Sequence, residues 1–119
     1  MEYGVEKEKN IMKNGVLMFD GEFLNGRKNG IGRAYYENGI LAIEGQYENG
    51  KINGEVKEYY KSSKLKFEGE YLNGKKHGYG KDYDENGELI FEGEYYKGKR
   101  YFNSILLKIM NYFYDENEI

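Results

Sequence analysis

A five-residue motif recurs every 24 residues along the chain. It contains an aromatic or aliphatic residue, an acid, a glycine, an acid or amide and an aromatic residue, and its copies begin at Phe19, Ile43, Phe67 and Phe91. An Asn-Gly or Lys-Gly pair follows each copy, at 25–26, 49–50, 73–74 and 97–98. A fixed period of roughly 20 to 50 residues is the signature of repeat proteins. The sequence therefore predicts three complete repeats, at 19–42, 43–66 and 67–90.

Each repeat carries the signals of a β-hairpin. The motif alternates apolar and polar residues, which is the period of a strand with one buried and one solvated face. Asn-Gly tolerates the positive φ angles of tight hairpin turns. A second strand over 30–36 then leads into another turn at 37–39. We expect an all-β fold, one elongated single antiparallel sheet of tandem β-hairpins over 11–101, with a truncated repeat at 91–101 and a lead-in at 1–10.

The first turn of a repeat fixes the register expected within it. Counting outward from a two-residue turn places Gly21 opposite Gly30, and Phe19 opposite Gly32. An aromatic ring that covers the bare backbone of a glycine stabilises such a pair by about 0.2 to 1 kcal/mol. At the second turn, Tyr35 recurs at 59 and 83. This recurrence predicts a bulge or a three-residue turn that brings the tyrosine onto the aromatic face.

Composition limits the functional classes. The 119 residues have a formal net charge of −3 and include 17 glycines, but no cysteine and no proline. The lack of cysteine excludes disulfides, thiolate metal sites and a cysteine nucleophile. No apolar run is long enough for a secretion signal or a membrane span, which favours a cytoplasmic protein. The mildly acidic balance argues against nucleic acid as a partner.

Two local features are similar to catalytic or metal-binding elements. His77 is the one histidine, and it takes the place of Asn29 and Asn53 in a turn, so we expect a turn residue and not a general base. Residues 82–87 resemble the start of a calcium-binding loop, but the closing carboxylate and the flanking helices are missing. We therefore expect no enzyme activity, no metal and no cofactor.

Two surfaces are candidates for binding a partner. A one-layer sheet has no second sheet to cover its rings, and exposed apolar patches mark interaction sites. Basic residues follow each Asn-Gly turn and should align along one margin. The alternative is that the rings bury one another and that the basic residues only solvate the turns and discourage edge pairing. The predicted partner-binding residues are Phe19, Phe23, Tyr35, Tyr47, Tyr59, Phe67, Tyr71, Tyr83, Phe91, Tyr95, Arg27, Lys28, Lys51, Lys75, Lys76, Lys99 and Arg100.

The repeat pattern ends at residue 102. Apolar residues then follow the i, i+3, i+4 spacing of a helix, at Phe102, Ile105, Leu106, Ile109, Met110 and Phe113. We expect residues 102–119 to form an amphipathic α-helix with an acidic tail, which caps the open end of the sheet as repeat stacks require. The alternative is a helix that docks a partner or dimerises.

The segment Phe67-Glu68-Gly69-Glu70-Tyr71, followed by Asn73-Gly74 and Gly78-Tyr79-Gly80, resembles MORN repeats. The 24-residue spacing is more similar to the bacterial variant found in antitoxin-like proteins than to the shorter eukaryotic unit. The second repeat departs from the pattern, with Val56 in place of a glycine, Ser62-Ser63 in place of Asn-Gly and Ile43 in place of phenylalanine.

The resemblance implies an elongated, twisted sheet that acts as a scaffold or partner-binding surface. We expect a non-enzymatic protein-binding module, an inhibitor or immunity/antitoxin-type partner that occludes another protein such as a toxin or effector. The alternative is a structural or membrane-associated scaffold that binds anionic phospholipid. Homodimerisation stays open.

Overall fold

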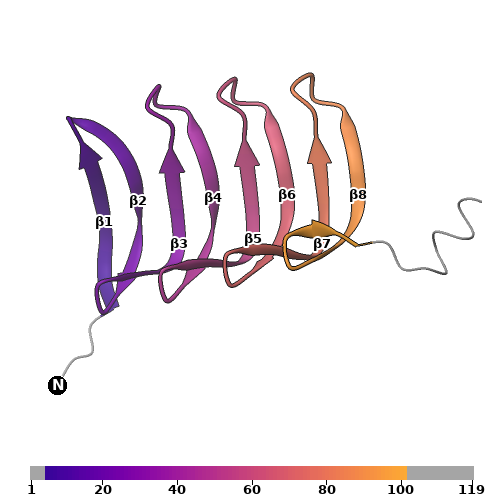
Figure 1. Cartoon of the computed structure of the whole chain (residues 1–119). Helices are drawn as coiled ribbons and strands as arrows, with labels where there is room; N and C mark the ends of the chain where they lie inside the picture. The colour runs from indigo at the N-terminus through magenta and orange to yellow at the C-terminus, as the bar shows by residue number, and fades with distance from the viewer. Residues whose placement is uncertain (1–4, 102–119) are drawn as a thin grey trace, which may run out of the picture.

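The computed structural model describes residues 5 to 101, with side chains from residue 9 onward. Nine strands form one antiparallel sheet, and their order in the sheet is their order in the sequence (Figure 1). This confirms the predicted sheet of tandem hairpins. Residues 5–10, the expected lead-in, belong to the first strand. The strands are β1 Val5–Lys13, β2 Val16–Leu24, β3 Arg27–Tyr35, β4 Leu41–Glu48, β5 Lys51–Tyr59, β6 Leu65–Leu72, β7 Lys75–Tyr83, β8 Leu89–Tyr96 and β9 Lys99–Arg100.

The predicted capping helix finds no support in the structure. Residues 5–101 contain strands, turns and loops but no helix. The predicted helix at 102–119 lies outside the described residues.

Two kinds of turn alternate along the two margins of the sheet. At the lower margin in Figure 1, two-residue turns join β2 to β3, β4 to β5, β6 to β7 and β8 to β9. Asn25 and Gly26 have φ angles of 51° and 77°, the left-handed values that such hairpin turns require. At the upper margin, longer loops over 36–40, 60–64 and 84–88 join β3 to β4, β5 to β6 and β7 to β8, whereas a two-residue turn at 14–15 joins β1 to β2. The first turn was therefore predicted correctly.

The register beyond that turn differs from the prediction. Gly21 pairs with Gly32 and not with Gly30, because β3 bulges after Lys28. Gly30 has a φ of 102°, and a β-carbon there would lie 2.7 Å from Oε1 of Glu22. That oxygen accepts a hydrogen bond from the backbone N–H of Ile31, at 2.9 Å. The second acid of the motif therefore closes a bulge, which a count from the turn could not include.

Rings cover glycines by a diagonal contact. A β-carbon at Gly32 would lie 2.5 Å from Cζ of Phe19. Phe19 itself pairs with Ala34, two residues further along β3. The same contact recurs between residues 67 and 80 in the third repeat. In the second repeat Ile43 replaces the phenylalanine and Val56 replaces the glycine. A smaller side chain on one strand thus makes room for a larger one on the next, so the two departures compensate each other.

The bulge predicted near Tyr35 is confirmed, but its effect is not. The register shifts between Ala34 and Tyr35 because β4 supplies the extra residue, Ala42. The alternation of β3 is therefore unbroken, and Tyr35 lies on the opposite side to the aromatic rings. Its hydroxyl donates to Oδ1 of Asp20, at 3.2 Å. The prediction that this tyrosine turns onto the aromatic face is wrong, and the same holds at Tyr83, whose hydroxyl donates to Glu68 at 3.0 Å.

Candidate functional site

One face of the sheet carries rings that pack on one another. The ring centroids of Phe19 and Tyr47 lie 5.5 Å apart, edge to face, and Phe67 contacts Tyr71 and Tyr95 in the same way. Phe67 is completely buried, and Phe19 is 3% exposed. The rings are thus the core of a one-layer sheet, with Phe19, Phe23, Phe67 and Tyr95 buried and Tyr47, Tyr71 and Phe91 partly exposed. We call this side the aromatic face and define it by Phe19, Phe23, Tyr47, Phe67, Tyr71, Phe91 and Tyr95.

The basic residues that follow the turns separate onto two sides, because alternate residues of a strand point opposite ways. Nζ of Lys28 lies 4.1 Å from the ring centroid of Phe19, and Nζ of Lys76 lies 4.2 Å from that of Phe67. Arg100 stacks over Phe91 at 4.6 Å. These three cations stabilise the aromatic face from within. The other four are exposed and form what we call the basic margin, Arg27, Lys51, Lys75 and Lys99.

A buried carboxylate ends the aromatic face. Asp82 is 9% exposed and accepts hydrogen bonds from the Tyr95 hydroxyl, from Lys76 at 3.3 Å and from Arg100 at 3.0 Å. The bond from Arg100 connects β9 to β7. One repeat earlier, the Tyr71 hydroxyl donates to Glu58. Burial raises the pKa of Tyr71 above its ordinary value, and the hydrogen bond to Glu58 raises this pKa further. Both carboxylates are partnered within the fold.

The opposite side, the polar face, carries a row of charges that alternate in sign from strand to strand. Asp20 pairs with Arg33, and Arg33 with Glu44, whose carboxylate lies 2.7 Å from Nε of Arg33. Among the described residues, Lys57 and Lys81 form no ion pair or hydrogen bond, although each lies between two glutamates. We call this row the charge ladder, Asp20, Arg33, Glu44, Lys57, Glu68, Lys81 and Glu92.

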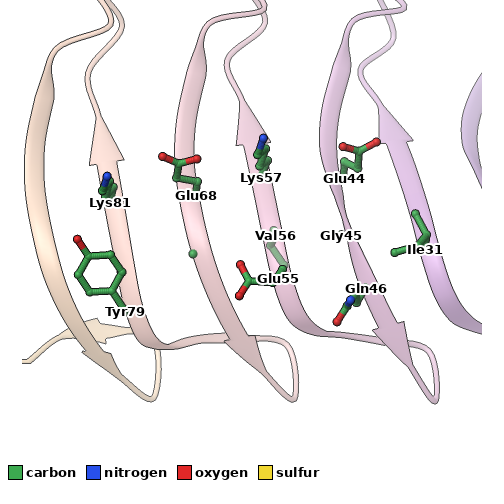
Figure 2. A pocket seen from close by; sticks show the side chains of 11 residues that line it. Ile31, Glu44, Gly45, Gln46, Glu55, Val56, Lys57, Glu68, Tyr79 and Lys81 are labelled. Atoms are coloured by element: carbon green, nitrogen blue, oxygen red, sulfur yellow. The ribbon is translucent and has the colours of Figure 1, made fainter.

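A groove of about 540 Å³ crosses the polar face from β3 to β7. Figure 2 shows four of the ladder residues, Glu44, Lys57, Glu68 and Lys81, in one row. A second row, two residues earlier on β3, β5 and β7, is what we call the anchor row, Ile31, Glu55 and Tyr79. Ile31 is 41% exposed and Tyr79 is 45% exposed. The Tyr79 hydroxyl donates to Glu92. The groove therefore combines uncovered apolar side chains with uncompensated charges.

None of the residues that line the groove was among the predicted partner-binding residues. A signal was present in the sequence, because positions 31, 55 and 79 are equivalent in the repeat but carry isoleucine, glutamate and tyrosine. A position that only builds the repeat tends to keep its residue type, as positions 21, 45 and 69 do. Tyr35 and Tyr83 border the polar face, and Tyr59 is half-buried at the equivalent position.

Of the two features similar to catalytic or metal-binding elements, His77 lies in the bulge of β7 and not in a turn as predicted, and Asp84 begins the loop over 84–88. Nδ1 of His77 accepts the backbone N–H of Lys97 at 3.4 Å. Asp84 accepts the backbone N–H groups of Asn86 and Glu88, at 2.9 and 3.0 Å, and so closes its own loop. Within residues 5–101 no three histidine, cysteine or carboxylate side chains gather as metal ligands. The same part of the chain holds no helix that could span a membrane.

Comparison with known families places these hairpins in one of them. Residues 28–49 and 52–73 match the MORN repeat variant model, and residues 67–87 match the MORN repeat model. The matches cover most of β3 to β7, the strands that form the groove. No curated protein shows a significant match to the chain. Period, fold and family models agree, and the chain is a MORN repeat protein.

Proposed function

We propose that this MORN repeat protein is a non-enzymatic protein-binding module, an inhibitor or immunity-type partner that occludes a site on another protein. The observation that carries the proposal is the groove on the polar face. It exposes Ile31 and Tyr79 beside the unpaired cations of Lys57 and Lys81. Protein interfaces combine apolar and aromatic contacts with a polar rim, and in this groove the charged residues lie between the two apolar side chains.

The chemistry of the groove favours binding over catalysis. General acid–base catalysis needs a titratable group whose position a neighbouring residue fixes. Glu55, Lys57 and Lys81 receive no such support from a hydrogen bond in the described part of the chain. Exposed charges without a fixed hydrogen-bond partner can pair with a binding partner but cannot hold a reacting atom in place.

Affinity capture with the full chain as bait tests the proposal. The matched bait is the double variant Glu55→Lys with Lys57→Glu, which exchanges two exposed charges on β5 and preserves the net charge. We expect the unaltered chain to retain a protein that the exchanged variant loses. The retained protein's activity should then fall when the chain is added in equal amounts.

Two results would contradict this proposal. If no protein distinguishes the two baits, the groove is not a protein-binding surface. If a protein is retained but keeps its full activity with the chain bound, the inhibitor role is wrong.

The basic margin supports a second candidate, a scaffold on anionic phospholipid. Arg27, Lys51, Lys75 and Lys99 are exposed along one edge, and surface attraction is about 1 kcal/mol per lysine or arginine. Co-sedimentation with phosphatidylserine vesicles at low salt, lost in 0.5 M salt and in a variant with all four changed to glutamine, is the expected result for this candidate. A chain that stays in the supernatant at low salt rules it out.

A further inference from the structure

We infer that the groove receives an α-helix of the protein partner, basic along the stripe that enters the groove and apolar at two positions about 14 residues apart. The inference rests on the proposed function, since it gives the chemistry of the partner at the same groove. It follows from the charge of the polar face and from the spacing of its rows.

Away from the basic margin, whose four cations lie along one edge of the same side, the polar face is acidic, although the whole chain is nearly neutral. Its bulge, ladder and anchor positions carry eight carboxylates and three basic side chains, a net charge of −5. The cations of the chain gather instead on the basic margin and over the rings. Complementary potential therefore favours a basic partner here and disfavours phosphate groups of lipid or nucleic acid. The carboxylates are Asp20, Glu22, Glu44, Glu55, Glu68, Glu70, Glu92 and Glu94.

The anchor row has the spacing of a helical heptad. Ile31, Glu55 and Tyr79 lie on β3, β5 and β7, and two strand spacings are about 9.6 Å. Seven residues of an α-helix rise about 10.5 Å and return to nearly the same side. A helix that crosses the strands thus presents residues i, i+7 and i+14 to the three anchors in turn. Their chemistry calls for apolar, basic and apolar side chains, in that order.

The charge ladder supplies the intermediate contacts. Glu44 and Glu68 lie on β4 and β6, the strands between those of the anchors, but in the neighbouring row with Lys57 and Lys81. A half-heptad step of three residues rises about 4.5 Å, close to one strand spacing. Basic side chains at i+3 and i+10 therefore face these two glutamates. Lys57 and Lys81, which have no partner within the described chain, repel a helix whose arginines are displaced toward them.

Other peptide conformations fit the rows less well. An extended strand reaches about 9.9 Å in three residues, but its side chains alternate, so the first and fourth residues point opposite ways. A polyproline II segment has the required period of about 9.3 Å. Its usual docking sites are grooves lined with aromatic rings, whereas the anchor row offers only Tyr79. The helix is the conformation that meets both the period and the chemistry.

A designed peptide tests the inference directly. It has 21 residues of alanine and glutamine with blocked ends, leucine at positions 4 and 18, and arginine at positions 7, 11 and 14. The matched peptide keeps the leucines and moves the arginines to 9, 13 and 16, on the far side of the helix. Fluorescence anisotropy with the full chain should show binding of the first peptide roughly tenfold tighter than the second, with a preference that falls as salt is added.

Chain variants identify the site of binding. Tyr79→Ala should weaken the first peptide roughly tenfold by removal of an anchor, and the exchange Glu55→Lys with Lys57→Glu should abolish the preference between the peptides. Lys99→Gln, on the basic margin, should have no effect. Circular dichroism checks that each variant keeps its sheet.

Three outcomes would overturn the inference. They are equal binding of the two peptides, insensitivity to the groove variants, and tighter binding of a proline-rich peptide with leucine and arginine three residues apart. If the native partner is captured and lost on exchange of residues 55 and 57 but the designed helix does not bind, the proposed function stands and the helix is wrong. If no partner depends on the groove, the proposed function itself fails.

Discussion

At the scale of single residues, the fold depends on paired sizes across neighbouring strands. Phe19 covers Gly32, whereas Ile43 and Val56 occupy the equivalent positions one repeat later. The chain thus contains both solutions to the same packing problem. The sequence shows that phenylalanine becomes isoleucine at one position and that glycine becomes valine at another. Only the contact between neighbouring strands explains why the two positions change in the same repeat.

A double-mutant cycle tests this pairing. Gly32→Val should lower the free energy of unfolding by roughly 1 to 3 kcal/mol, because the valine meets the Phe19 ring. Adding Phe19→Ile, which recreates the second repeat, should recover at least about 1 kcal/mol of that loss. Urea denaturation of the single and double variants measures the coupling. Simple additivity of the two losses would show that the contact is not the cause.

Tyr71 provides a prediction for alkaline pH. Its pKa is raised in the folded state, so folding favours the neutral hydroxyl, and the associated stability is complete below the unfolded pKa of about 10. As the pH rises above 10, this stability declines by less than about 1.4 kcal/mol per pH unit, because partial exposure screens the effect. Tyr71→Phe should lose less stability between pH 9 and 11 than the unaltered chain. The exposed Tyr96→Phe should follow the unaltered chain.

At the scale of elements, side chains in the bulges hold each hairpin to the next two-residue turn. Asn53 Oδ1 accepts the backbone N–H of Asn73 at 2.9 Å, and Asn29 and His77 do the same for the turns at residues 49 and 97. The sequence predicted His77 as a turn residue because asparagine stands at the equivalent positions, whereas His77 lies in the bulge of β7. The sequence could not show that the side chain accepts a hydrogen bond from the following turn.

Substitution at His77 separates this role from a chemical one. His77→Asn keeps an acceptor and should change the free energy of unfolding by less than about 0.5 kcal/mol, whereas His77→Ala should lower it by roughly 0.5 to 1.5 kcal/mol. Urea denaturation distinguishes the two. A loss for His77→Asn as large as that for His77→Ala would exclude the acceptor role.

The upper loops are connected to the following repeats by hydrogen bonds from tyrosine hydroxyls. Tyr36 and Tyr60 donate their hydroxyls to the backbone carbonyls of Tyr59 and Tyr83, one repeat further on. The third repeat has Asp84 at this position, and its carboxylate closes its own loop instead. The change from tyrosine to aspartate thus coincides with the last complete repeat.

A hydroxyl deletion tests the tie between loops. Tyr60→Phe removes a 2.7 Å hydrogen bond and should lower the free energy of unfolding by about 1 kcal/mol. Amide exchange should accelerate mainly at residues 60–64 and 84–88. Faster exchange confined to the first loop would mean that the tie does not couple repeats.

At the scale of the whole molecule, the sheet is quasi-one-dimensional. Each strand pairs only with its neighbours in sequence, so stability is a sum of local terms and strand-to-strand terms. Charge is also distributed in rows, with acidic bulge and ladder positions across the polar face and the basic margin along its edge. No strand near one end of the sheet contacts a strand near the other end.

This architecture predicts that damage stays local. Phe67→Leu should cost roughly 1 to 2 kcal/mol, which raises amide exchange about tenfold in β5 to β8 while β2 and β3 keep their protection. Hydrogen exchange followed by mass spectrometry gives this comparison. A uniform rise over all strands would instead indicate one cooperative unit.

The sequence by itself determined the repeat period, the hairpins, the tight turns and the identity of the two faces. These features depend on residue types at fixed spacing along one chain, which the printed sequence contains in full. Tertiary structure decided how neighbouring strands align. Two-residue bulges at Gly30 and its equivalents shift the register, and an extra residue on β4 leaves Tyr35 on the polar face.

The candidate site was also decided by the tertiary structure. The aromatic rings look available in a one-layer sheet until the structure shows them packed against one another and beneath Lys28 and Lys76. The groove arises because residues 24 positions apart, such as Glu55 and Tyr79, lie only two strands apart in space. Which side chains pair and which stay free depends on cross-strand distances of a few ångströms, and a periodic sequence does not encode those directly.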